Sequence, residues 1–150
     1  MKIKTIAQSA RLPFLILTPV CVLLGTGVVV FEKVSVDWFL LILVLIGALS
    51  AHISVNTLNE YLDYKSGLDL QTKRTNFSGG SGALPKHPEM LNLVLITAII
   101  FLLITTVIGF YFVSLHGLEI MPIGLLGLVL IVGYTDWINK HPLLCLISPG

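Results

Sequence analysis

Charged residues are scarce in this sequence. Asp, Glu, Lys and Arg together make up 11% of its 150 residues, whereas hydrophobic residues make up 55%. A soluble domain carries roughly 25% charged residues, because its surface faces water. The composition therefore excludes an ordinary soluble globular domain and indicates an integral membrane protein. The net charge of +1 leaves no basic excess for nucleic acid, so no such partner is expected.

Cysteine is nearly absent as well. The two cysteines, Cys21 and Cys145, lie in or beside apolar stretches and form no CxxC pair. Two isolated cysteines provide neither a disulfide framework nor the ligand spacing of a zinc site. We interpret both as small apolar packing residues.

The sequence contains several long apolar segments. A membrane-spanning helix needs about 20 apolar residues. The first segment follows a basic start and contains no charge, which indicates a retained helix rather than a cleaved leader. The expected fold is an all-α, polytopic transmembrane bundle with four spans and the start of a fifth. The predicted spans are residues 12–31, 38–58, 91–114 and 120–135, and a fifth apolar segment begins within 142–150.

The connectors set the expected topology and orientation. Short connectors at 32–37 and 115–119 predict two antiparallel helical hairpins, joined by a long connector at about 59–90. Every lysine and arginine except Lys33 lies in the N-terminal segment, the long connector or the C-terminal end. Positive charge favours the cytoplasmic side. We therefore expect these three parts in the cytoplasm, with the protein in a bacterial inner membrane.

One polar stripe runs down the second predicted span. It consists of His52, Asn56, Asn59 and Asp63. At 3.6 residues per turn these four positions lie within roughly 60° of one another around a helix. A further carboxylate, Asp69, follows the helix-breaking Gly67. Polar residues within a membrane helix indicate a functional site, so this stripe is the main candidate.

The chemistry of the stripe points to magnesium and a diphosphate. Asn59, Asp63 and Asp69 offer oxygen ligands, which suit Mg²⁺ or Ca²⁺ rather than zinc. Mg²⁺ typically combines one or two carboxylates with substrate phosphates. Asn56 and His52 are expected to line the cavity, although helix packing is an equally good interpretation of His52. The candidate phosphate contacts are the basic residues Lys65, Lys73 and Arg74.

A glycine-rich segment follows these basic residues. It reads Ser-Gly-Gly-Ser-Gly-Ala-Leu-Pro over residues 78–85. Glycines let a backbone approach an anion closely. Together with Asn59-Glu60-x-x-Asp63 and Asp69, this segment resembles the UbiA-type intramembrane aromatic prenyltransferases. It is most similar to their menaquinone branch, the dihydroxynaphthoate polyprenyltransferases.

The resemblance implies a fold and a reaction. Such enzymes are helical bundles, usually of nine transmembrane helices, around a central cavity. There Mg²⁺ and aspartates bind a polyprenyl diphosphate, and an aromatic ring attacks the allylic cation formed by its ionisation. By match, Asn59 and Asp63 are the implied catalytic ligands of the metal or the diphosphate, with Asp69 as a further ligand. The implied partners are a polyprenyl diphosphate, an aromatic acceptor and the bilayer.

Two departures from the family pattern leave alternatives open. Glu60 stands where Asp is commoner, and it lies about 80° from the stripe around the helix. A second aspartate-rich motif, which the resemblance implies, does not occur in these 150 residues. We therefore expect residues 1–150 to be the N-terminal half of a prenyltransferase-like domain, which could need a C-terminal half or a second copy. A non-catalytic fragment and a transporter or channel half are the alternatives; the few polar residues in the last two spans disfavour a channel.

Overall fold

The structure, a computed structural model, describes residues 2–71 and 80–133. All regular structure in these two ranges is helical, which confirms the predicted all-α class. Some of the helices are short turns at the ends of longer ones. In chain order the elements are α1 (Lys2–Ser9), η1 (Leu12–Ile16), α2 (Leu17–Phe31), α3 (Trp38–Ser66), α4 (Leu68–Gln71), α5 (Ala83–Lys86), η2 (Pro88–Met90), α6 (Leu91–His116), η3 (Leu118–Ile120) and α7 (Met121–Gly133).

Three stretches are long and apolar enough to cross a membrane: Leu12–Phe31, Trp38–Ser66 and Pro88–His116. They correspond to the first three predicted spans. The fourth predicted span is described only as α7, whose 13 residues fall short of the usual requirement of about 20. The predicted fifth segment lies outside the described residues. The structure therefore supports three spans by length and composition.

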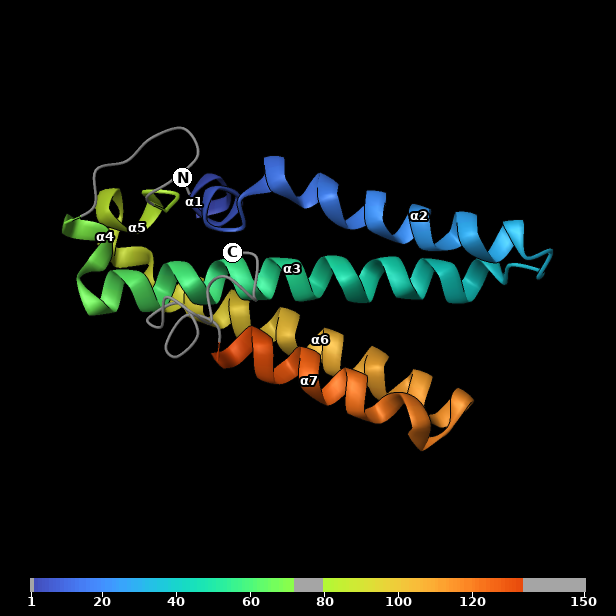
Figure 1. The fold of residues 1–150 in the computed structure, drawn as a ribbon. Helices are drawn as coiled ribbons and strands as arrows, with labels where there is room; N and C mark the ends of the chain where they lie inside the picture. Colours follow the sequence, from blue (N-terminus) through green and yellow to red (C-terminus); the bar gives the residue numbers. More distant parts are fainter. Residues whose placement is uncertain (1, 72–79, 134–150) are drawn as a thin grey trace.

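The long helices lie side by side, and the short helices α1, α4 and α5 gather at one end (Figure 1). α3 packs against α2, α6 and α7, while α1 and α5 contact each other and the end of α3. This end is where α3 finishes and α6 begins. The expected long loop at 59–90 is therefore partly wrong. Residues 59–66 continue α3, and two short helices, α5 and η2, precede α6.

Local chemistry explains the length of α3. At its start, the Asp37 carboxylate accepts hydrogen bonds from the amides of Phe39, at 2.9 Å, and Leu40, at 3.1 Å. Such a cap satisfies amides that have no partner inside the helix. At its end, Gly67 adopts φ of 79°, the left-handed conformation that commonly terminates helices. Nothing between these two signals breaks the helix, so the polar stripe is helical throughout.

The contact between α3 and α6 holds the centre of the bundle. Ser54 Oγ donates to the Ala98 carbonyl at 2.9 Å in a buried hydrogen bond. Gly47 lies against Ile108, and a Cβ at Gly47 would come within 3.1 Å of Ile108 Cγ2. Small and hydroxyl-bearing residues allow close approach of membrane helices. By contrast α2, which is described in full, contains no buried residue, so its apolar surface suits lipid contact.

Gly47→Leu should weaken this helix contact. The added side chain would overpack the interface with Ile108, at a cost of about 1–3 kcal/mol. Gly27→Leu is the matched control, because a Cβ there meets nothing within 4 Å while the change in helix propensity is the same. Unfolding of both variants in mixed micelles measures the difference. Equal stabilities would contradict the packing described here.

Candidate functional site

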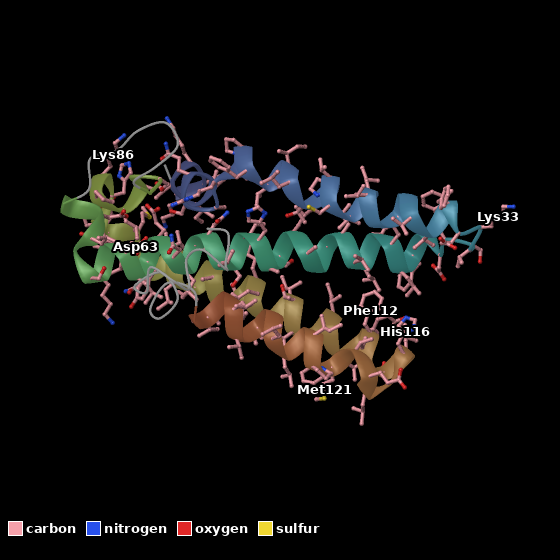
Figure 2. All side chains as sticks on the ribbon, in the orientation of Figure 1. Lys33, Asp63, Lys86, Phe112, His116 and Met121 are labelled. Carbon is pink, nitrogen blue, oxygen red and sulfur yellow. The ribbon has the colours of Figure 1, made fainter. Side chains whose placement is uncertain are left out.

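The polar stripe ends among the short helices at one end of the bundle. Asn59 and Asp63 are half-buried on the last turns of α3. Figure 2 labels Asp63 and Lys86 at this end and Lys33 and His116 toward the other. Asp69 follows on α4 and is 5% exposed. The structure therefore gathers three of the predicted ligands, Asn59, Asp63 and Asp69, in one terminal region of α3.

The deeper half of the stripe attaches the N-terminal segment to α3. His52 Nδ1 and Thr18 Oγ1 of α2 lie 2.7 Å apart in a hydrogen bond. Asn56 Nδ2 donates to the Ala10 carbonyl, just after α1, at 3.0 Å. Both side chains thus have partners that hold helices together, as the packing interpretation of His52 anticipates. Their proposed role in lining a cavity stays a prediction.

Glu60 is the most buried carboxylate of the region, with 1% of its surface exposed. Its oxygens accept hydrogen bonds from residues that lie 21 to 24 positions later in the sequence. The donors are the Ser81 amide at 3.1 Å, the Ser81 hydroxyl at 2.7 Å, the Ala83 amide at 3.2 Å and the Leu84 amide at 3.4 Å. A buried carboxylate needs such donors to offset its loss of hydration.

These donors belong to residues 80–84, which we call the returning segment. Gly80 and Gly82 within it have φ of 72° and 69°, values that favour glycine. Gly80 also lies against Asp69, since a Cβ on it would be 2.6 Å from Asp69 Oδ1. Leu84 is fully buried and packs with Met90 and Val94. The glycine-rich segment singled out in the sequence is therefore in contact with both Glu60 and Asp69.

The predicted basic contacts are less well placed. Lys65 is exposed, and its Nζ lies 5.7 Å from the centre of the Tyr61 ring, an arrangement typical of a cation–π contact. Both residues are on the side of α3 away from the polar stripe, as their spacing from His52 requires. Lys73 and Arg74 lie outside the described residues. A role for the three in binding phosphate stays a prediction.

The candidate donors for a magnesium ion are the Asn59 amide oxygen and the carboxylates of Asp63 and Asp69. In the parts of the chain that the structure describes, no three His, Cys, Asp or Glu side chains form a group able to hold a metal. Mg²⁺ takes one or two carboxylates and completes its shell with phosphates and water. An ion held by these residues would therefore need phosphate oxygens to complete its shell, and a magnesium site here stays a prediction.

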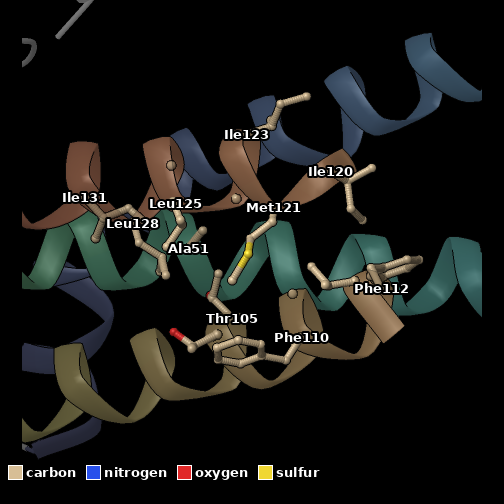
Figure 3. A pocket seen from close by; sticks show the side chains of 15 residues that line it. Ala51, Thr105, Phe110, Phe112, Ile120, Met121, Ile123, Leu125, Leu128 and Ile131 are labelled. Carbon is tan, nitrogen blue, oxygen red and sulfur yellow. The ribbon is translucent and has the colours of Figure 1, made fainter. Parts of the chain in front are cut away.

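An apolar cavity of about 470 Å³ lies between α3, α6 and α7. Met121 of α7 points across the cavity toward Thr105 and Phe110 of α6 (Figure 3). Ala51 of α3 also lines it. The two hydroxyl groups among its lining residues, those of Thr105 and Thr106, donate to carbonyls of α6, and Thr105 Oγ1 also lies 3.3 Å from the Gly47 carbonyl of α3. The lining therefore suits a hydrocarbon chain rather than a polar ligand.

Comparison with known proteins identifies the family. A profile of the UbiA prenyltransferase family matches residues 18–148, which is most of the chain. The chain belongs to this family. The resemblance based on the motif at Asn59–Asp69 and on the glycine-rich segment is thereby confirmed. Membership of the UbiA family and the apolar helices together make this an integral membrane protein.

Two curated relatives of this UbiA family member are named prenyltransferases. It is 34% identical over 101 residues to the protoheme IX farnesyltransferase of Cytophaga hutchinsonii, covering 67% of this chain and 33% of the relative. It is 33% identical over 114 residues to the 1,4-dihydroxy-2-naphthoate octaprenyltransferase of Bacillus subtilis, covering 76% of this chain and 35% of the relative. The chain thus spans about a third of the length of these relatives. No solved structure matches it.

Sequence reasoning had left Glu60 without a role in this UbiA family member. Its partners in the returning segment produce no periodic signal, because they lie 21 to 24 residues further along the sequence and outside α3. Two features of the sequence pointed to this contact: Glu60, a carboxylate beside the polar stripe, and the glycine-rich segment. In the structure Glu60 accepts hydrogen bonds from that segment.

The hydrogen bond between Thr18 and His52 should couple α2 to α3. Thr18→Val and His52→Phe together should cost less than the sum of the two single changes, by about 0.6 kcal/mol and at most about 1.7 kcal/mol. Thr26→Val is the control, since Thr26 Oγ1 donates to the Val22 carbonyl of its own helix. A double-mutant cycle of unfolding in micelles measures the coupling. Strict additivity for Thr18 and His52 would refute it.

Proposed function

We propose that this chain is the N-terminal half of an intramembrane prenyltransferase. It would transfer a polyprenyl group from a prenyl diphosphate to an aromatic quinone precursor, in a magnesium-dependent reaction. The observation that carries the proposal is the placement of Asn59 and Asp63 at the polar end of an apolar helix, with the buried Asp69 in the same region. Membership of the UbiA family supports the same reaction class.

The proposed residues have distinct tasks in this reaction. Asn59 and Asp63 would hold Mg²⁺, with Asp69 as a further ligand, and the ion when bound supplies positive charge to the diphosphate oxygens. The bond between the allylic carbon and its oxygen breaks, and the diphosphate leaves with the electron pair. A carbon of the aromatic ring forms the new bond, and the ring then loses a proton. Lys65, Lys73 and Arg74 are proposed contacts of the leaving diphosphate.

The substrates and location follow by the same inference. The relative from Bacillus subtilis is named for 1,4-dihydroxy-2-naphthoate, which favours a naphthoate acceptor and a role in menaquinone synthesis. Both relatives come from bacteria, so we propose the bacterial inner membrane. The distribution of lysine and arginine favours a cytoplasmic location for the N-terminus and the motif region. A C-terminal half or a second copy would supply the remaining diphosphate ligands.

The transporter alternative gains no support from the described helices. A polar path would need side chains that face one another through the depth of the bundle. On α6, the hydroxyls of Thr97, Thr105 and Thr106 donate to carbonyls of the same helix. These groups are already used, and we therefore retain the transferase as the proposed function.

Asp63→Asn tests the function directly. The change removes the charge that would hold Mg²⁺ while keeping the size of the side chain, so prenyl transfer should fall by about a hundredfold. Membranes that carry the protein, with its C-terminal half where one is required, are given a radiolabelled prenyl diphosphate and a naphthoate acceptor, with and without a chelator. Glu119→Gln, at the opposite end of α6, is the control. The proposal would be overturned if prenyl transfer persisted in Asp63→Asn and also persisted in the presence of the chelator.

A further inference from the structure

Glu60 is a buried carboxylate that the proposed reaction does not use. It lies off the polar stripe and is 1% exposed, so it meets neither substrate nor solvent directly. Burial of a carboxylate is unfavourable unless hydrogen bonds replace its lost water. A glutamate at this position needs a physical reason, and its partners provide one.

The four donors to Glu60 described above all come from the returning segment. The Oε1 atom accepts from the Ser81 hydroxyl and from the amides of Ala83 and Leu84, and Oε2 accepts from the Ser81 amide. The Ser81 hydroxyl oxygen additionally accepts from the Ala83 amide at 3.1 Å. One side chain of α3 thus fixes Ser81 and the first two amides of α5, those of Ala83 and Leu84.

Fixing the returning segment also fixes what lies next to Asp69. Gly80 directly precedes Ser81 and is in contact with the Asp69 carboxylate, so tightly that a Cβ would lie 2.6 Å from Oδ1. On the other side, Leu84 is anchored in the cluster with Met90 and Val94. The returning segment is therefore held between Glu60, Asp69 and the start of α6.

We propose that Glu60 is a positioning residue for the diphosphate site. By holding the returning segment, it sets Gly80 against Asp69 and keeps that carboxylate in place near the end of the polar stripe. This inference rests on the proposed function, in which Asp69 is a ligand. A carboxylate suits the task because both of its oxygens accept. A glutamine would turn an NH₂ group toward amide donors and leave at least one of them unpaired.

The experiment measures the hydrogen-bonded segment and the site separately. The protein is reconstituted in nanodiscs, together with its C-terminal half where one is required, and hydrogen exchange follows the amides of Ser81, Ala83 and Leu84. Calorimetry then measures binding of inorganic diphosphate in the presence of MgCl₂. The variants are Glu60→Gln, Glu60→Asp and Ser81→Ala. Glu89→Gln is the matched control, because Glu89 is an exposed carboxylate that pairs with His87 and not with the returning segment.

Hydrogen exchange and diphosphate binding should change together in the variants. Glu60→Gln should speed exchange at these amides and weaken diphosphate binding by about tenfold, the loss typical of an unpaired buried donor. Ser81→Ala should shift both in the same direction by a smaller factor. Glu60→Asp restores the charge and should recover binding to within about threefold. Glu89→Gln should leave both unchanged.

Each contradictory result would reject a different part of the proposal. Faster exchange in Glu60→Gln with unaltered diphosphate binding would show that Glu60 only stabilises the segment, and would overturn the positioning role alone. Unaltered exchange would overturn the hydrogen-bonding basis of the proposal. Failure of the unaltered chain to bind diphosphate with MgCl₂ would overturn the proposed function, and the positioning role with it. If Glu60→Gln does not fold, Ser81→Ala decides the same question by the same two measurements.

Discussion

The hydration lost by the buried Glu60 carboxylate is the constraint on which the polar end of the molecule depends. A carboxylate that is buried in the protein to this extent is tolerated only where hydrogen-bond donors surround it. Residues 80–84 lie against α3 and supply amide and hydroxyl donors. This contact holds the start of α5 against α3. The glycine-rich segment is therefore a structural partner of α3.

α3 is connected to the other helices by a few polar contacts on different faces. His52 contacts Thr18 of α2, and Asn56 contacts the Ala10 carbonyl just after α1. Ser54 contacts α6. Hydrophobic burial distinguishes poorly between helix pairs in a membrane, because lipid is equally apolar, whereas hydrogen bonds and close packing are specific. The same helix thus carries the fold and, on its last turns, the proposed ligands Asn59 and Asp63.

Much of the fold could be predicted from composition and spacing. Low charge and long apolar segments predicted the three apolar stretches that the structure describes, and helical spacing predicted a common face for His52, Asn56, Asn59 and Asp63. The role of Glu60 could not be predicted, because its donors follow a connector whose path no periodicity reveals. The expected connector at 59–90 was partly wrong, because residues 59–66 belong to α3. The helical spacing of Asn59 and Asp63 and the helix-breaking Gly67 already indicated this longer helix, which ends at Gly67.

The central claim is that the polar end of α3 binds a diphosphate through magnesium. Equilibrium binding of a labelled prenyl diphosphate to the chain in nanodiscs, titrated with Mg²⁺, tests it most directly. The account predicts saturable binding that requires Mg²⁺ and is lost in both Asn59→Ala and Asp63→Asn, but kept in Glu119→Gln. Binding that is equally strong without Mg²⁺, or that is unaffected by these two changes, would contradict it.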